Sequence, residues 1–152
     1  MIKFYADLLK GLDFQLTKDT DLIAGLANAS AYLFEHLPDI NWAGFYLMRG
    51  GELVLGPFQG KTARVRIPLN EGVCGAAATA RAIVRVHDVH EFPGHIACDP
   101  ISNSEIVLPI FDNDGLFAVL DIDSPTVGRF TADDEDGLAV FANMISDFVM
   151  RS

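Results

Sequence analysis

The sequence predicts one α+β domain, in which a central, mainly antiparallel sheet carries helices packed on one face. Three observations predict it: leucines at helical spacing near the N-terminus, short apolar runs separated by turns in the middle, and an amphipathic C-terminal segment. The chain has 152 residues, 50% of them apolar, which suits a single domain with its own core. We therefore expect residues 1–152 to fold as one unit.

The first forty residues are predicted to be helical. Leucines recur near the helical period from Leu22 to Leu37, and Thr20 stands where an N-cap residue is expected. Pro38 closes this region, because proline cannot continue a helix.

From Asn41 onward the pattern changes to short runs of aromatic and aliphatic residues, which is typical of strands. Arg49-Gly50-Gly51 separates the first two runs as a turn, so these runs are predicted to form a hairpin. The elements expected up to residue 86 are strands at 42–48, 52–58, 64–68 and 83–86, and a short alanine-rich helix at 72–80.

The segment from His87 to Asn103 has no apolar periodicity and is predicted to be an irregular loop, of the kind that often carries function. The runs 104–111 and 116–123 then give the strongest hairpin signal of the chain. A final amphipathic helix is expected from its N-cap at Thr131 toward Met150, with acidic residues in its first turn.

Pairing within this last hairpin depends on its turn. If residues 113–115 form a three-residue loop with Gly115 in the left-handed conformation, Asp112 pairs with Leu116. Counting back along both strands then gives these further pairs: Phe111 with Phe117, Pro109 with Val119, Val107 with Asp121, and Glu105 with Asp123.

In this register Glu105, Asp121 and Asp123 share one face of the hairpin. Like charges that face each other destabilise a strand pair, so the cluster needs an explanation. Either this end of the hairpin lies in water, or the carboxylates bind a cationic ligand and relay a proton, since crowding raises their pKa. The opposite face is apolar and is expected to lie on the core: Ile106, Leu108, Ile110, Leu116, Leu120 and Ile122.

Charge and hydropathy exclude several classes of partner. The formal net charge of -10 would repel phosphate backbones, which argues against nucleic acid. No apolar stretch approaches the roughly 20 residues of a membrane-spanning helix. The segment Met1 to Asp7 lacks the basic and apolar regions of a secretory signal. We therefore expect a soluble, cytoplasmic protein that does not bind membranes.

Two cysteines are too few for a disulfide framework and are expected to be free, catalytic or metal-bound in a reducing compartment. Cys98 lies in the irregular loop, where a reactive thiol is favoured over a structural one. Cys74 stands at the start of a helix, whose backbone amides would stabilise a thiolate. Packing is nevertheless the favoured interpretation of Cys74, because free cysteine is among the most buried residue types.

A rival interpretation takes four residues of the irregular loop as zinc ligands: His87, His90, His95 and Cys98. Their spacings are chemically feasible but match no structural zinc pattern closely. We therefore predict no bound metal.

Several motifs between Asn41 and Phe130 are specific in combination: Asn41-Trp42-Ala43-Gly44-Phe45-Tyr46, Leu55-Gly56-Pro57-Phe58-Gln59-Gly60-Lys61, Gly72-Val73-Cys74-Gly75, Asp88-Val89-His90 through to Asp99, Ser104-Glu105-Ile106-Val107 and Leu120-Asp121-Ile122-Asp123-Ser124. With these motifs the segment resembles the free methionine-(R)-sulfoxide reductases. This family is built on the GAF fold and reduces the free amino acid, not residues within proteins.

The resemblance implies a GAF-like domain with Cys98 as nucleophile. It also implies substrate-binding side chains at Trp42, Tyr46, Glu105, Asp121 and Asp123, with Glu105 and Asp123 taking part in catalysis. Attack on the sulfoxide would convert the nucleophile to a sulfenic acid, and a second thiol would condense with it. Thioredoxin, kept reduced by NADPH and thioredoxin reductase, would reopen the disulfide. No bound cofactor is implied, and the assembly implied is a homodimer.

One position departs from the family pattern. The family typically carries a third cysteine, commonly its resolving thiol, where this chain has Arg64. Either Cys74 resolves the sulfenic acid, or an external thiol does, or the protein does not turn over. In the last case it would be a non-catalytic GAF-type sensor that binds a small amino acid.

Overall fold

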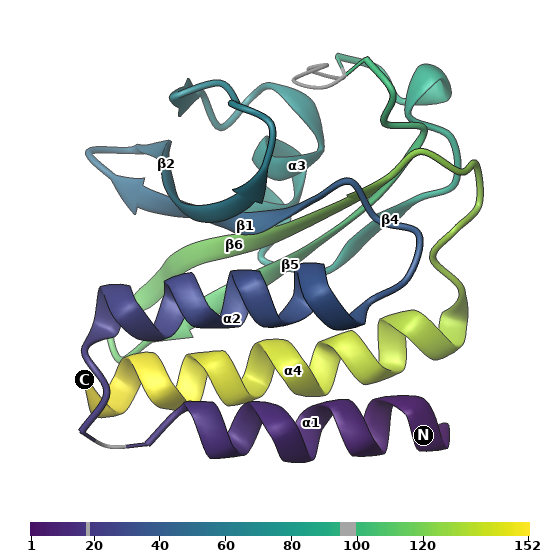
Figure 1. The fold of residues 1–152 in the computed structure, drawn as a ribbon. Helices are drawn as coiled ribbons and strands as arrows, with labels where there is room; N and C mark the ends of the chain where they lie inside the picture. The colour runs from purple at the N-terminus through teal and green to yellow at the C-terminus, as the bar shows by residue number, and fades with distance from the viewer. Residues whose placement is uncertain (18, 95–99) are drawn as a thin grey trace.

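The computed structural model describes residues 1–17, 19–94 and 100–152 and confirms the predicted α+β class. A twisted sheet forms the middle layer, and helices cover it (Figure 1). The helices and strands of these residues are α1 (Lys3–Gln15), α2 (Leu22–His36), β1 (Trp42–Arg49), β2 (Glu52–Gly60), β3 (Arg66–Ile67), α3 (Gly72–Ala80), β4 (Val84–Val86), the 3-10 helix η1 (Val89–Glu91), β5 (Ser104–Asp112), β6 (Gly115–Ser124) and α4 (Ala132–Arg151).

The six strands of the described chain form one sheet in the order β3-β2-β1-β6-β5-β4, and every neighbouring pair is antiparallel. The predicted hairpin of β1 and β2 is confirmed, although its turn is one residue shorter than expected, because Arg49 pairs with Glu52. Gly50 and Gly51 make the turn with φ of 61° and 80°. Positive φ at both central residues is what a two-residue hairpin turn requires, and glycine adopts it without strain.

The two faces of the sheet are covered differently. Helices α2 and α4 pack on one face, as predicted, and α1 packs against these two helices. Together with the sheet they enclose the larger apolar core, with Phe45, Leu108 and Phe141 at its centre. The short helix α3 lies on the opposite face, where it closes a smaller apolar cluster that includes Trp42. One short helix therefore lies on the second face, whereas long helices cover the first.

The caps of two helices test the predicted boundaries. Helix α4 begins as predicted, since the Thr131 hydroxyl accepts from the Asp134 N–H and the Asp134 carboxylate accepts from the Thr131 N–H, which is a capping box. For α2 the expected N-cap at Thr20 is wrong. The side chain of Asp21 accepts a hydrogen bond from the Ala24 N–H at 3.0 Å and caps the helix instead.

Asp134 is more than a capping residue, because three side chains converge on it in the interior. Its carboxylate accepts hydrogen bonds from the Tyr5 hydroxyl at 2.5 Å, from Arg129 at 3.0 Å and from the Thr131 hydroxyl at 3.0 Å. Burial works to raise the pKa of Asp134, but hydrogen bonds from Thr131 and Tyr5, together with the Arg129 charge, outweigh it and hold the pKa below its usual value. The network joins α1 to the start of α4.

We expect Asp134→Asn to lower the free energy of unfolding by about 2 to 4 kcal/mol at neutral pH, because it leaves charged and hydroxyl donors without their acceptor. A carboxyl whose pKa is lowered on folding stabilises the protein above its unfolded pKa and loses that contribution as the pH falls through the folded value. The gap between variant and wild type should therefore narrow below about pH 4. Denaturant unfolding at several pH values measures this difference in free energy of unfolding, with the exposed Asp133→Asn as control. A difference of the same size at every pH would contradict the lowered pKa of Asp134.

The hairpin of β5 and β6 carries the acidic residues, and its predicted register is confirmed for the part that contains them. Pro109 pairs with Val119, Val107 with Asp121, and Glu105 with Asp123.

The turn of this hairpin differs from the predicted one. The predicted pairs of Asp112 with Leu116 and of Phe111 with Phe117 are wrong: Asp112 pairs with Gly115, and Phe111 pairs with Leu116. The loop therefore has two residues, and the register shifts by one between Ile110 and Phe111. This β-bulge leaves one extra residue on β6. Leu116 consequently packs with the smaller cluster around α3 and not on the main core, where it was expected. The remaining five apolar residues of the predicted face do lie in the main core: Ile106, Leu108, Ile110, Leu120 and Ile122.

Other boundaries moved by a few residues. The third strand is confined to Arg66–Ile67, and the fourth begins at Val84. Within the predicted irregular loop, residues 89–91 form the short helix η1. Across the described residues, none of the helices combines the length and the apolar character needed to span a bilayer.

Candidate active site

A pocket opens between α3 and the sheet. It encloses about 540 Å³, including the space at its open mouth. Its walls contain every described residue that the sequence singled out as catalytic or substrate-binding: Trp42, Tyr46, Cys74, Glu105, Asp121 and Asp123. These residues come from β1, α3, β5 and β6. The remaining candidates, Cys98 and His95, lie outside the described residues.

The three carboxylates lie inside this pocket, so the interpretation of the hairpin end as a solvated surface is wrong. Glu105 and Asp121 are each 6% exposed, and Asp123 is half-buried. Burial, followed by the charge of Asp123, raises the pKa of Glu105 well above its usual value. Burial and the charge of Glu105 do the same to the pKa of Asp121. In both groups the protonated form is therefore favoured more than in an exposed acid.

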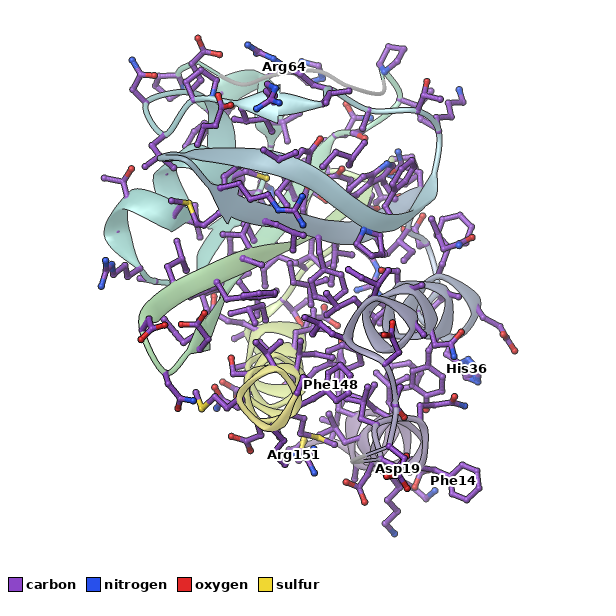
Figure 2. All side chains as sticks on the ribbon, turned by 90° about the vertical axis from the view of Figure 1, so that its left-hand side faces the viewer. Phe14, Asp19, His36, Arg64, Phe148 and Arg151 are labelled. Carbon is purple, nitrogen blue, oxygen red and sulfur yellow. The ribbon has the colours of Figure 1, made fainter. Side chains whose placement is uncertain are left out.

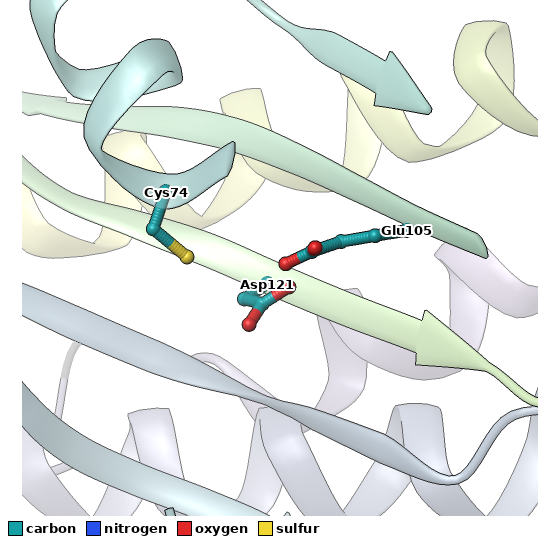
Figure 3. A group of neighbouring side chains, drawn as sticks. All are labelled: Cys74, Glu105 and Asp121. Atoms are coloured by element: carbon teal, nitrogen blue, oxygen red, sulfur yellow. The ribbon is translucent and has the colours of Figure 1, made fainter. Parts of the chain in front are cut away.

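Cys74 faces these carboxylates from the first turn of α3 (Figure 3). It is 4% exposed, which agrees with the favoured interpretation of Cys74 as a packed residue. Burial, and then the charges of Asp121 and Glu105, raise the pKa of the Cys74 thiol well above its usual value. The expected stabilisation of a thiolate by the helix N-terminus is thus outweighed, because the acidic neighbours and the loss of water act in the opposite direction.

Trp42 and Tyr46 form the aromatic wall of the pocket, and Phe58, which does not line the pocket, stacks on Trp42. Trp42 lies between Tyr46, with ring centroids 5.9 Å apart, and Phe58, with centroids 5.2 Å apart. The Trp42 indole N–H donates to the Lys61 carbonyl at 3.0 Å, and the Tyr46 hydroxyl donates to the Arg64 carbonyl at 2.9 Å. With these polar atoms bonded to backbone, the rings offer mainly apolar surface to a ligand.

Arg64 lies on the side of the sheet away from Phe148 and the long helices (Figure 2). Its guanidinium forms an ion pair with Glu71 at 2.9 Å, and Glu71 lines the pocket directly before α3. Residue 64 therefore borders the pocket, although it stands in the segment before β3 and not within a strand. Four further residues line the pocket and were missed by sequence reasoning, since single small or polar residues outside the strands carry no distinctive pattern: Thr62, Ala63, Glu71 and Ser102.

Two histidines of the rival zinc set, His87 and His90, lie among the described residues, and for His90 the ring has a hydrogen-bond partner. The His90 ring nitrogen Nε2 hydrogen-bonds the Asn103 side chain at 2.8 Å. The His87 carbonyl accepts from the Gly128 N–H at 2.8 Å. Neither residue belongs to the group of potential metal ligands that the described residues bring together, which consists of Cys74, Glu105 and Asp121.

Comparison with known proteins agrees with the fold. Residues 16–147 match the GAF domain family. The free methionine-R-sulfoxide reductase of Escherichia coli (strain K12) is 56% identical over 90% of this chain and 82% of its own length. The corresponding reductase of Saccharomyces cerevisiae is 43% identical over 82% and 73%. The X-ray structure of the Neisseria meningitidis enzyme in complex with its substrate superposes with a TM-score of 0.94 at 38% identity, covering 100% of this chain and 93% of that one.

The match to the GAF domain family covers most of the chain, so the antiparallel sheet with its covering helices is a domain of the GAF type. Within that class, the chain belongs to the free methionine-(R)-sulfoxide reductase family.

Proposed function

We propose that this chain reduces free methionine-(R)-sulfoxide to methionine at the pocket under α3, with Cys98 as nucleophile. The observation that carries the proposal is that one pocket gathers the buried acids, the aromatic wall and Cys74. Membership of a family whose named members are free methionine-R-sulfoxide reductases supports the choice of substrate. The assignment of Cys98 as nucleophile rests on its place in the sequence motif.

In the first step the Cys98 thiolate attacks the sulfoxide sulfur. The sulfoxide oxygen must gain a proton as its bond to sulfur breaks, and a carboxylic acid with a raised pKa, such as Glu105, can donate it. The oxygen ends on Cys98 as a sulfenic acid, and methionine leaves as the thioether. Trp42 offers the apolar surface that the S-methyl group needs.

In the second step another thiol attacks the Cys98 sulfur, water leaves, and a disulfide forms. We propose Cys74 or an external thiol in this role, because Arg64 replaces the family's third cysteine. Thioredoxin then reopens the disulfide by thiol exchange, with NADPH and thioredoxin reductase as the source of electrons. This chemistry requires a reducing compartment, so the proposal includes the cytoplasm. The homodimer implied by the family resemblance is also proposed.

The acids also account for a preference for the free amino acid. Among the described residues that line the pocket, four are acidic and none is basic: Glu71, Glu105, Asp121 and Asp123. A free amino acid carries an ammonium group that such a lining attracts. A methionine sulfoxide within a peptide lacks that charge and would bring its flanking chain into a pocket of limited size.

The experiment is a thioredoxin-coupled assay that follows NADPH consumption with free methionine-(R)-sulfoxide, its S-epimer and a peptide containing the sulfoxide. We expect turnover with the first substrate alone. Comparable rates with the peptide would assign the chain to another class of sulfoxide reductase. Binding of the free amino acid without turnover under any reductant would favour the GAF-type sensor. This is the second candidate function, because Arg64 replaces the family's third cysteine.

A further inference from the structure

We propose that the pocket binds a second kind of ligand, a thiophilic divalent metal ion such as Zn²⁺ or Cd²⁺, held by Cys74, Glu105 and Asp121. The ion is an inhibitor and not a cofactor, because it occupies side chains that the proposed reaction needs for substrate.

The geometry of the three side chains suits such an ion. One ligand atom from each, the Cys74 sulfur and one oxygen of each carboxylate, lies within 4.8 Å of the others. Figure 3 shows the Cys74 side chain descending from α3 toward the two carboxylates on the sheet. In a tetrahedral zinc site the ligand atoms lie about 3 to 4 Å apart, since zinc bonds are about 2.0 Å to oxygen and 2.3 Å to sulfur. Small side-chain rotations would close the remaining gap.

A second observation, at Asp121, supports a cation at this position. Asp121 is 6% exposed, and its Oδ1 atom is buried with no hydrogen-bond partner among the described residues. A carboxylate oxygen is an acceptor, and leaving it buried without a donor or a cation is unfavourable. A metal ion between the three side chains would satisfy this oxygen directly.

The ligand types select the metal. A thiolate with two carboxylates favours zinc or cadmium over magnesium and calcium, which take oxygen ligands and several waters. Three protein ligands leave the fourth position of a tetrahedral ion for water, and the open mouth of the pocket supplies it. Binding displaces the Cys74 proton to solvent, because the thiolate is the ligand.

The test uses Cys98→Ser protein, in which Cys74 is the sole thiol, titrated with Cd²⁺ while the ultraviolet thiolate-to-cadmium absorption is recorded. We expect one Cd²⁺ per chain with this absorption. Adding Cys74→Ser should remove the absorption, and adding Asp121→Asn should weaken binding at least tenfold while circular dichroism stays unchanged. Absence of the absorption, or full affinity after Asp121→Asn, would overturn the site.

A matched control separates this site from the histidines of the irregular loop. Replacing His87 and His90 together by glutamine should leave Cd²⁺ affinity unchanged, and a loss of affinity there would assign the metal to the loop instead. In the wild type, Zn²⁺ should inhibit competitively with methionine sulfoxide, and a chelator should restore activity. Non-competitive inhibition would place the ion elsewhere. This last arm rests on the proposed function, whereas the titration does not.

Discussion

Cys98→Ser is expected to release no methionine from methionine-(R)-sulfoxide, whereas Cys74→Ser is expected to release about one equivalent per chain and then stall. The nucleophile is needed before methionine can leave, but the resolving thiol is needed only afterwards. Rapid mixing followed by quantification of methionine separates the two variants. In the wild type, substrate should yield a Cys74–Cys98 disulfide, seen as a cross-linked peptide by mass spectrometry.

The burial of Cys74 sharpens this expectation. Because burial and acidic neighbours raise the pKa of the Cys74 thiol, little thiolate is present at neutral pH, and resolution should be the slow step after methionine is released. If Cys74→Ser turns over with thioredoxin at the wild-type rate, Cys74 does not resolve and an external thiol does.

Adding Arg64→Cys to the Cys74→Ser variant tests whether a thiol at position 64 can take over the resolving step. Residue 64 borders the pocket through the Tyr46 hydrogen bond and the Glu71 ion pair, so a thiol there is placed at the same mouth. We expect thioredoxin-dependent turnover to return. Arg64→Ser in the same background removes the same ion pair without supplying a thiol and should remain stalled. Equal activity of the two would show that loss of the arginine, and not gain of a thiol, is responsible.

Glu105→Gln and Asp123→Asn are expected to lower the single-turnover rate of methionine release by about 10² to 10⁴, the usual contribution of a positioned acid. Each substitution keeps the shape of the side chain while removing a charge or an ionisable proton. Stability should stay the same or rise, because repulsion between Glu105 and Asp123 across the strand pair is relieved.

Asp114→Asn is the matched control for these acids. Asp114 is an exposed acid of the same hairpin, but it lies in the turn at the end away from the pocket. It should turn over like the wild type. Wild-type single-turnover rates in Glu105→Gln and Asp123→Asn would mean that these buried acids neither donate the proton nor bind the substrate.

The shared face of the three acids could be predicted from sequence, because side chains along a strand alternate between its two faces. Glu105, Asp121 and Asp123 had to share a face once the pairing of Val107 with Asp121 was inferred, and the apolar residues between them fixed which face met the core. The pairs near the acids were predicted correctly although the turn was not. The turn is one residue shorter than predicted, and the bulge adds one unpaired residue to β6, so the two errors cancel. Leu116, beyond the bulge, is where the prediction was wrong.

What could not be predicted is the surroundings of these acids. No local pattern shows that α3 packs over them, since its alanines and glycines would suit either face of the sheet. Sequence left a solvated end as an alternative for the same reason. The N-cap of α2 was predicted one residue too early, at Thr20, because threonine is a good capping residue and stands next to Asp21, which caps the helix. Only the three-dimensional packing decides such questions.

Because of the bulge between β5 and β6, the length of the turn can differ without a change in the register of the acidic residues. Irregular pairing near the turn absorbs changes in chain length, whereas regular pairing from Pro109 and Val119 onward holds the acids in place. Asn113 and Asp114, both exposed, therefore form a natural insertion point. A short affinity peptide or a fluorescent label placed there would report on the protein without disturbing its ligand chemistry.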